Sequence, residues 1–373
     1  MRVGIVMPLA EQRGGGEQTL LDLLQHGLNV NINWYVIFLE NGPMVKQIEV
    51  LGVTVAVFPS GRLREPHRLL QTIEKIASFA KQEHLNVLIG WMWKAHLYSG
   101  LAAIRAGLPS LWYQQEIPDD KNVLKRIVNL IPARGVITLT KAGKKAQARL
   151  HPHGRTLQVY PGVNIDRFNP EILPTQVEVR SKLDLPQDIP IVGLVGRLQQ
   201  WKGIHTLIEA MPNILLRYPN AQCVIVGGQH DLEPDYLDSI EHKISELRLG
   251  DRAILTGLQQ NIPEWMQAMD VIVHASDNEP FGIVVIEAMA LGKPVVAGAS
   301  GGPTEIITPE VDGLLASYGD SSALAEAILR YLDDREFARC IGAAAHLRAQ
   351  DFSTQHYARN FVAAIHDLLP EMI

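Results

Sequence analysis

Residues 271–298 read VIVHASDNEPFGIVVIEAMALGKPVVAG, and they contain two apolar runs on either side of a helical run. The first residues form a short apolar run that predicts a strand over 271–274. The run from Phe281 to Leu291 predicts a helix, because Gly292 is a good helix terminator and Pro294 opens the next apolar run. Nearly continuous apolar strands around a helix are typical of a parallel sheet that is covered on both faces.

The same alternation of apolar strand-like runs with helical runs extends over both halves of the chain. It predicts βαβ units and therefore a doubly wound α/β fold. In the first half the strand-like runs are 3–7, 34–39, 54–58, 87–92, 110–113 and 135–140, and in the second half they are 189–195, 222–226, 253–255, 271–274 and 294–298.

The length predicts two domains. A single core rarely grows beyond about 250–300 residues, and this chain has 373. The alternation falters over 161–186, a segment rich in proline and turn residues, which predicts the interdomain connection. We therefore expect Rossmann-like domains at 1–168 and 169–352, facing each other across a cleft lined by the carboxyl ends of their strands. Residues 353–373 predict a final helix; the pattern leaves open which domain it covers, and packing back on the N-terminal domain is one alternative.

Composition excludes some classes of protein. The chain has 34 basic and 40 acidic residues, a net charge of −6, which disfavours a general nucleic-acid binder. Cys223 and Cys340 form neither a metal cluster nor a disulfide framework, which fits a reduced cytoplasmic compartment. The first residues are typical of a strand rather than of a signal peptide, and no run of 18 apolar residues predicts a transmembrane helix.

Two acidic residues flank the start of the helix expected after the strand 271–274. Glu279 lies in the preceding loop, next to a helix N-terminus whose free N–H groups favour anions. Glu287 lies in an apolar run, where a charge is costly unless it is hydrogen-bonded, and a pair of ligand hydroxyls would satisfy it. The alternative is a solvated loop acid and an ordinary polar helix position.

A second candidate loop follows the strand 189–195 and reads GRLQQWKG. Gly196 permits a tight turn, and the cations Arg197 and Lys202 bracket the loop. Two such cations can clamp a diphosphate and neutralise the charge that develops on a phosphate leaving group. The chain has no Asp-x-Asp triplet, so this pair predicts a metal-independent site; the alternative is two ordinary surface cations.

Two glycine-rich turns follow predicted strands. Gly14, Gly15 and Gly16 come after the first strand, where consecutive glycines allow the backbone to approach a phosphate or a sugar. Residues 300–303 (SGGP) come after the strand 294–298. Each turn either lines a binding site or only reverses the chain.

Together these motifs resemble family 4 of the retaining glycosyltransferases, whose architecture of two Rossmann-like domains is called GT-B. The resemblance rests on the spacing of Glu279 and Glu287, on the loop from Gly196 to Gly203, and on YPGVNIDRF at 160–168. It implies transfer of a hexosyl unit from a UDP-, GDP- or ADP-sugar to a hydroxyl acceptor with retention of configuration, in polysaccharide or glycolipid assembly. It implies no required cofactor and no metal.

The resemblance also implies site residues. Glu279 would contact hydroxyls of the donor sugar and Glu287 the ribose, while Arg197 and Lys202 would hold the diphosphate; Arg197, Lys202 and Glu279 form the implied catalytic set. The further implied donor contacts are Gly15 and Gly16 facing the diphosphate, Gly257 and Leu258 near the base, and Phe281, Gly282 and Ile283 through their amides.

One departure from the family concerns the N-terminal domain. Members often carry a histidine near the end of the strand that corresponds to SLWYQQEIP, where this chain has Gln115. Gln115 can hydrogen-bond a sugar hydroxyl but cannot accept a proton, and His96 is an alternative contact. The resemblance implies front-side attack with the leaving phosphate as base, which needs no enzymatic base.

The expected acceptor is a sugar or a lipid-linked sugar. Basic clusters in the first half suit anionic lipid headgroups, and hence a cytoplasmic protein with peripheral contact at the inner face of the membrane, or they are solvated helix faces. The competing functions are a nucleotide-sugar epimerase or hydrolase of the same fold, a dinucleotide enzyme, which the missing G-x-G-x-x-G disfavours, and an inactive scaffold. The basic clusters are Arg62, Arg64 and Arg68; Lys121, Lys125 and Arg126; and Lys141, Lys144, Lys145, Arg149 and Arg155.

Overall fold

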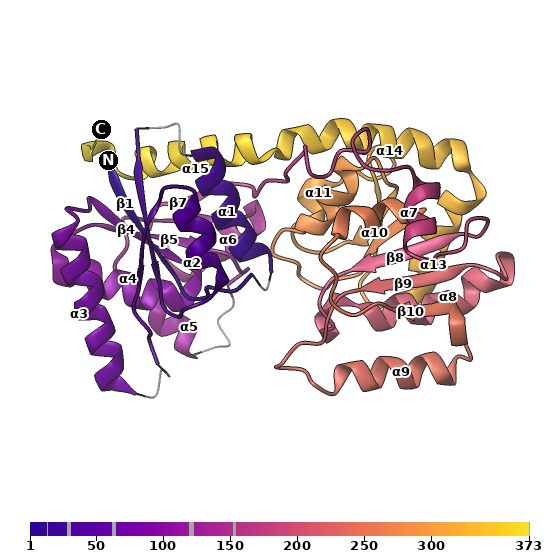
Figure 1. The fold of residues 1–373 in the computed structure, drawn as a ribbon, viewed down its shortest axis with the longest axis horizontal. Helices are drawn as coiled ribbons and strands as arrows, with labels where there is room; N and C mark the ends of the chain where they lie inside the picture. Colours follow the sequence, from indigo (N-terminus) through magenta and orange to yellow (C-terminus); the bar gives the residue numbers. More distant parts are fainter. Residues whose placement is uncertain (13, 28–30, 62–64, 119–122, 152–153, 373) are drawn as a thin grey trace. The chain divides into compact units, whose positions relative to one another are not determined.

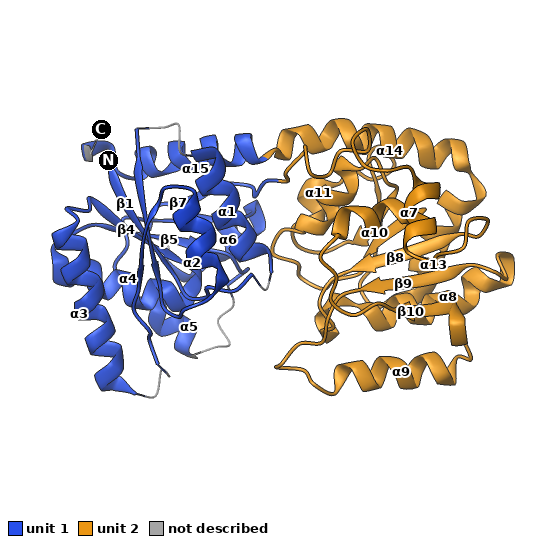
Figure 2. Ribbon diagram, in the orientation of Figure 1, with its two compact units in different colours: residues 1–162, 354–373 blue, residues 163–353 orange. Residues whose placement is uncertain are grey.

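The computed structural model describes residues 1–12, 14–27, 31–61, 65–118, 123–151 and 154–372. It divides into two compact units, each built on one parallel sheet with helices (Figure 1). Unit 1 comprises residues 1–162 and 354–373, and unit 2 comprises residues 163–353 (Figure 2). The predicted α/β class with two Rossmann-like domains is confirmed.

Unit 1 has a seven-stranded sheet in the order β3-β2-β1-β4-β5-β6-β7, in which every neighbouring pair is parallel. The strand order reverses between β1 and β4. The strands are β1 Arg2–Met7, β2 Asn33–Phe38, β3 Thr54–Val57, β4 Val87–Trp91, β5 Ser110–Gln114, β6 Gly135–Thr138 and β7 Thr156–Gln158, and the helices are α1 Gly15–Gly27, α2 Pro43–Val50, α3 Pro66–Gln82, α4 Met92–Ala106, α5 Val123–Val128, α6 Lys141–Leu150, α15 Thr354–Leu368 and the short η4 Pro370–Met372.

Unit 2 has a six-stranded parallel sheet in the order β10-β9-β8-β11-β12-β13, with the reversal between β8 and β11. The strands are β8 Ile191–Val195, β9 Gln222–Val226, β10 Ala253–Leu255, β11 Val271–His274, β12 Val295–Gly298 and β13 Leu314–Ala316. The helices are α7 Gln176–Lys182, η1 Gln200–Lys202, α8 Ile204–Arg217, α9 Tyr236–Glu246, η2 Gly250–Arg252, α10 Ile262–Ala268, α11 Ile283–Ala290, α12 Pro303–Ile306, α13 Ser321–Asp333, α14 Arg335–Ala349 and η3 Gln350–Phe352.

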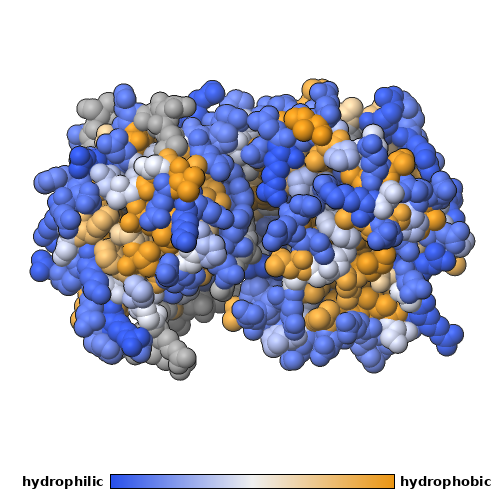
Figure 3. All heavy atoms as spheres, in the orientation of Figure 1, coloured by the Kyte–Doolittle hydropathy of each residue, from blue (hydrophilic) through white to orange (hydrophobic). Residues whose placement is uncertain are grey.

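Alternating side chains let each sheet bury both of its faces. In β4, Gly90 lies against His96 and Ser99 of α4, whereas the next residue, Trp91, contacts Phe361 of α15 on the opposite face. Central strands such as β8 and β11 are buried along their whole length. The face drawn in Figure 3 mixes hydrophilic and hydrophobic residues, as is normal for a folded surface.

The chain passes from one unit to the other at two adjacent places. Val163 forms a parallel bridge with Ser353, and its N–H donates to the Phe352 carbonyl at 2.7 Å. The first crossing therefore falls after Gly162 rather than after residue 168, because Val163 is held in unit 2 by this bridge. The second crossing leads into α15, which packs against α1 in unit 1.

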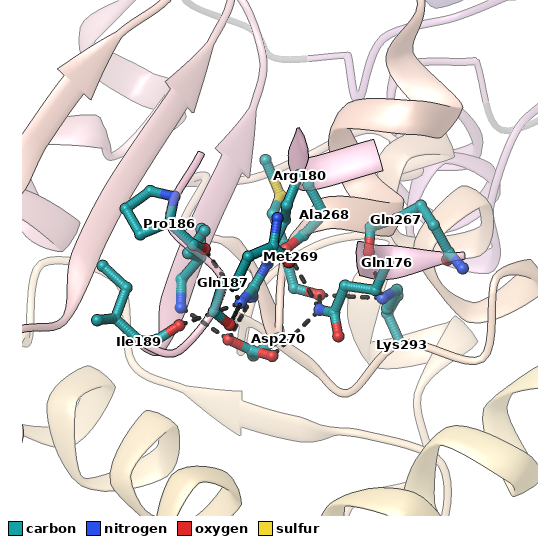
Figure 4. Close-up of polar contacts among 11 residues, drawn as sticks. Gln176, Arg180, Pro186, Gln187, Ile189, Gln267, Ala268, Met269, Asp270 and Lys293 are labelled. Atoms are coloured by element: carbon teal, nitrogen blue, oxygen red, sulfur yellow. Dashed lines mark hydrogen bonds and ion pairs between the residues drawn. The ribbon is translucent and has the colours of Figure 1, made fainter. Parts of the chain in front are cut away.

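A polar network fastens α7 to the amino ends of β8 and β11 (Figure 4). The Arg180 guanidinium pairs with Asp270 at 2.8 Å and also donates to the carbonyls of Ala268 and Gln187. Asp270 in turn accepts from Gln176 and from the Ile191 amide, at 3.1 and 2.8 Å. This network lies at the amino edge of the sheet and leaves the carboxyl edge to other residues.

Candidate functional site

Three loops meet at the carboxyl edge of the unit 2 sheet. The loops after β8 and β9 are joined by a bridge between Leu198 and Gln229, and the loop after β10 is joined to them because the Gly227 amide donates to the Gly257 carbonyl at 3.0 Å. A Cβ on Gly227 would lie 1.9 Å from the Gly196 carbonyl, so glycine is needed for this approach. The predicted positions Gly257 and Leu258 thus share an edge with the Arg197 loop.

The loop after β8 also reaches the end of β11. Gly203 has φ +70°, and a Cβ there would lie 2.0 Å from the Ala275 carbonyl, so only glycine allows η1 to pack this closely. The close approach brings Lys202 to Glu279, with 2.6 Å between Nζ and Oε2. Both side chains are largely buried, with 16% and 12% exposed. The structure therefore brings together two residues that the sequence predicted separately.

Glu279 stays ionised in this setting. Burial raises the pKa of its carboxyl, but the nearby Lys202 charge and a contact with His274 outweigh burial and hold the pKa well below its usual range. His274 Nε2 lies 3.2 Å from the same Oε2 atom that Lys202 contacts. The site thus holds a buried carboxylate with two nitrogen partners on one oxygen.

The backbone around Glu279 is fixed by the glycine-rich turn after β12. Glu279 bridges to Gly301, and the Gly302 amide donates to the Glu279 carbonyl at 2.8 Å. A Cβ on Gly301 would lie 2.2 Å from the Glu279 carbonyl oxygen, and one on Gly302 would lie 2.1 Å from that of Phe281. This turn therefore packs directly against the Glu279 loop in addition to reversing the chain.

Helix α11 begins immediately after the Pro-Phe-Gly turn. Gly282 has φ +104°, a conformation that glycine adopts readily, and it directs the chain into the helix at Ile283. The first N–H groups of a helix have few partners within the helix, which leaves them able to bind a ligand. The Phe281 ring is buried and packs 5.9 Å from Phe352, so Phe281 can meet a ligand only through its backbone. Glu287 lies in the second turn of α11 and is half-buried.

Arg197 is half-buried, and no hydrogen bond or ion pair of its guanidinium is found among the residues that the structure describes. An unpaired guanidinium in the same loop as Lys202 is a ready partner for an anion, since its five N–H groups match phosphate oxygens. In the described ranges, no group of three or more His, Cys, Asp and Glu side chains is arranged to hold a metal ion.

In unit 1, the predicted residues Gly16 and Gln115 lie close together. Gly15 and Gly16 open α1, and the Gly16 carbonyl accepts from Trp91 Nε1 at 2.9 Å. A Cβ on Gly16 would lie 2.4 Å from Gln115 Oε1. Both residues therefore lie at the carboxyl edge of the unit 1 sheet, beside its topological switch point.

His96 lies elsewhere. Its side chain is 1% exposed and stacks on Trp112, with 4.7 Å between the ring centroids. Burial lowers the pKa of His96 to about 4. The expectation that His96 contacts a sugar is not supported by this position, because the ring is part of the core of unit 1.

Some of the basic residues predicted for a membrane surface are engaged in ion pairs. Lys125 pairs with Glu116, Arg68 with Glu65, and Arg155 with Asp367. Arg62, Arg64 and Lys121 lie outside the described residues. No ion pair within the described part of the chain involves the remaining exposed cations Arg126, Lys144, Lys145 and Arg149.

His274 is a site residue that was not predicted from the sequence. It is the last residue of β11 and only 4% exposed, and it contacts both Glu279 and Ser276. A polar residue that ends an apolar strand was the available signal, but the same pattern is typical of a strand that runs out into solvent.

Known proteins resemble this chain in sequence and in fold. The sequence profile of the family described as "Glycosyl transferases group 1" matches residues 176–348. The D-inositol 3-phosphate glycosyltransferase of Corynebacterium urealyticum is 32% identical over 58% of this chain and 52% of its own length. The lipopolysaccharide core biosynthesis mannosyltransferase LpsB of Rhizobium meliloti is 28% identical over 56% of this chain and 60% of its own length. The chain thus spans about half the length of the curated relatives it matches.

Solved structures match over nearly the whole chain. Anabaena Alr3699/HepE in complex with UDP and glucose has a TM-score of 0.87 and 25% identity, covering 98% of this chain and 100% of that one. The sucrose-phosphate synthase of Thermosynechococcus elongatus has a TM-score of 0.81 and 25% identity, covering 99% of each chain. The two Rossmann-like units are those of the GT-B fold. Over residues 176–348, which lie within unit 2, the chain is therefore similar to the glycosyl transferases group 1 family.

Proposed function

We propose that this protein is a glycosyltransferase that moves a hexosyl unit from a nucleotide-diphosphate sugar to a hydroxyl acceptor. The observation that carries the proposal is the buried Lys202–Glu279 pair, together with the unpaired Arg197 in the same loop as Lys202, at the carboxyl edge where doubly wound sheets bind ligands. A carboxylate accepts hydrogen bonds from sugar hydroxyls, and two cations bind a diphosphate. This edge of the sheet therefore has binding groups for both the sugar and the diphosphate of the donor.

We propose a UDP-sugar as the donor. The structure of Alr3699/HepE in complex with UDP-glucose matches this chain with a TM-score of 0.86. In this assignment Arg197 and Lys202 hold the diphosphate, Glu279 accepts from a sugar hydroxyl, and Glu287 accepts from the ribose. Gly257 and Leu258 lie toward the base, and the amides of Phe281, Gly282 and Ile283 complete the contacts.

The proposed reaction retains the anomeric configuration. The bond between the sugar C1 and the phosphate oxygen breaks, and the acceptor oxygen bonds to C1 on the same face. The acceptor proton passes to the leaving phosphate oxygen, so no side-chain base is needed. Arg197 and Lys202 neutralise the negative charge that develops on the phosphate, and this kind of electrostatic stabilisation is commonly the largest catalytic contribution.

The edge of unit 1 that carries Gly15, Gly16 and Gln115 is proposed to contact substrate. Glycine N–H groups suit phosphate oxygens, and the Gln115 amide suits a sugar hydroxyl. We assign the acceptor to polysaccharide or glycolipid assembly, in line with the relative LpsB, whose name places it in lipopolysaccharide core biosynthesis.

We further propose that unit 1 contacts the inner face of the membrane. In the described chain, no helix has both the length and the apolar character needed to cross a bilayer. However, Leu124, Ile127 and Leu130 are exposed around α5, next to the unpaired cation Arg126. Apolar side chains beside cations favour an anionic lipid surface.

Vesicle cosedimentation tests the membrane proposal. With vesicles of phosphatidylcholine and phosphatidylglycerol, the double variant Ile127→Ser, Leu130→Ser should bind several-fold more weakly than the wild type. Leu216→Ser is the matched control, because Leu216 is as exposed as Leu130 but lies in unit 2. Equal binding by all three proteins would show that this surface does not contact lipid.

Thermal denaturation with UDP-, GDP- and ADP-sugars in EDTA tests the donor proposal. A UDP-sugar at about 100 times its dissociation constant should add about 2.7 kcal/mol to the free energy of unfolding. Arg197→Ala should abolish the shift, whereas Arg335→Ala, at an exposed arginine that starts α14, should keep it. Stabilisation by NAD(P)H instead of any nucleotide sugar would refute the assignment.

A further inference from the structure

Lys202 and His274 both contact one oxygen of Glu279. Lys202 Nζ lies 2.6 Å from Oε2 and His274 Nε2 lies 3.2 Å from the same atom. The other oxygen, Oε1, has no hydrogen-bond partner among the residues that the structure describes. The carboxylate is thus held on one side and keeps an acceptor for a ligand on the other.

Lys202 has two possible binding partners. It is the charged partner of Glu279, and in the proposed function the same ammonium binds the donor diphosphate. A buried carboxylate that loses its charged partner is strongly destabilised. If Lys202 turns toward a phosphate, Glu279 therefore needs a second donor that stays in place.

His274 is built to be that donor. It closes β11, where its backbone is in register with Ala297 of β12, so its position is set by the sheet and not by a loop. A carboxylate only accepts hydrogen bonds, so the contact requires the hydrogen on Nε2. Its other ring nitrogen, Nδ1, is buried and has no partner in the described part of the chain, so Glu279 and Ser276 supply the polar contacts of the ring.

We propose that His274 is a positioning residue. It holds Oε2 of Glu279 while Lys202 binds the diphosphate, so that Oε1 remains directed at a hydroxyl of the donor sugar. This inference rests on the proposed function. It predicts that His274 strengthens binding of the sugar part of the donor and leaves binding of the nucleotide part unchanged.

Two polar substitutions at one position test the proposal. The side-chain amide nitrogen of His274→Gln reaches about as far as Nε2 and keeps a donor for Glu279, whereas that of His274→Asn reaches only as far as Nδ1. Dissociation constants for UDP and for UDP-glucose are measured by calorimetry for both variants and the wild type. We expect His274→Asn to weaken UDP-glucose binding about 10- to 100-fold, as for the loss of a hydrogen bond to a charged group, and to leave UDP binding within about twofold. His274→Gln should restore most of the loss.

His346→Leu is the matched control, because His346 of α14 bonds the Ala290 carbonyl and not Glu279. It should leave the ratio of the two affinities unchanged. The proposal is overturned if His274→Asn weakens both ligands equally, or if His274→Gln and His274→Asn behave alike. A wild type that binds neither UDP nor UDP-glucose would instead refute the proposed donor, and the two failures are therefore distinguishable.

Discussion

The loop that carries Glu279 packs against two glycines, Gly301 and Gly302. The site therefore depends on these small residues as well as on its charged ones. Gly302 has φ −57° and ψ −41°, which any residue adopts, so its role does not depend on an unusual backbone. It depends on space, because a Cβ would lie 2.1 Å from the Phe281 carbonyl oxygen and 2.3 Å from the Phe281 Cα. Neither of these backbone atoms can move without moving the loop that carries Glu279.

We therefore expect Gly302→Ala to reduce turnover of the nucleotide sugar about 100-fold, which is the cost of a catalytic group displaced by roughly 1 Å. The initial rate with a saturating UDP-sugar is the measurement. Gly27→Ala is the control, because its Cβ would lie 3.5 Å or more from any neighbour, the nearest being Trp34. A Gly302→Ala enzyme with the wild-type rate would show that this turn does not position the loop.

His96 makes a second prediction at this scale, through the pH dependence of stability. Burial lowers the pKa of His96 to about 4 in the folded protein, against about 6.5 in the unfolded chain. Between these values only the unfolded state takes up the proton, so the free energy of unfolding falls by about 3 kcal/mol as the pH drops from 6.5 to 4.

His96→Phe keeps a ring to stack on Trp112 but cannot titrate. Its stability, measured by urea denaturation at several pH values, should fall less steeply over this range than that of the wild type. Equal slopes would contradict the assigned pKa. Carboxylates that titrate over the same range affect both proteins, so the difference between the two slopes is the quantity that reports on His96.

The sequence predicted candidate residues better than it predicted their contacts. Glu279 and Lys202 stood out through their loops, yet nothing in the sequence placed them 2.6 Å apart, because that contact depends on Gly203 packing against Ala275. The burial of His96 was equally hidden, since a histidine after an apolar run is compatible with either a site or a core. Such contacts are properties of the packed fold and not of local pattern.

At the scale of helices and strands, local pattern predicted most of the strands, including the short edge strand β10. The expected strands 222–226, 253–255 and 271–274 have these bounds in the structure. Two edge strands of three residues each, β7 and β13, were not predicted from the sequence. Helix α11 begins at Ile283 rather than at Phe281, since Gly282 has a positive φ that no helix interior accepts.

The network around Arg180 makes the prediction for this scale. Its guanidinium is 4% exposed and its partner Asp270 is 33% exposed. Arg180→Met removes the charged partner of Asp270 and the donor to several carbonyls, so we expect the free energy of unfolding of unit 2 to fall by about 3 kcal/mol, the lower end of the range for a broken buried pair. Hydrogen exchange of unit 2 amides against urea concentration measures the change.

Lys182→Met is the matched control on the same helix. Lys182 pairs with Glu264 at 2.7 Å, but its side chain is 57% exposed. Exposed pairs contribute about 0–1 kcal/mol, so this variant should remain close to the wild type. If both variants lose the same stability, the network of Figure 4 does not fasten α7 more firmly than a surface contact would.

At the scale of the whole molecule, the C-terminal segment serves both units. In unit 2, the ring of Phe352 of η3 lies 5.9 Å from that of Phe281, measured between ring centroids. The Arg348 guanidinium lies over the Phe352 ring. A few residues later, Phe361 of α15 packs 5.0 Å from Tyr113 and 5.5 Å from Trp91 in unit 1. The sequence predicted an amphipathic helix here but not the domain against which it packs. The helical spacing of apolar residues identifies the buried face of a helix but not the surface that covers this face.

A matched pair of substitutions in this segment tests the division into units. Phe361→Ala should lower the free energy of unfolding of unit 1 by about 3–5 kcal/mol, the usual cost of truncating a buried aromatic ring, and Phe352→Ala should do the same to unit 2. Mass spectrometry of hydrogen exchange reads the units separately, since local stabilities differ within one chain. We expect Phe361→Ala to speed exchange in residues 1–162 and Phe352→Ala to speed it in residues 163–353. If each variant loosened both ranges equally, the chain would unfold as one cooperative body, and the crossing between Phe352 and Phe361 would not be a boundary in stability.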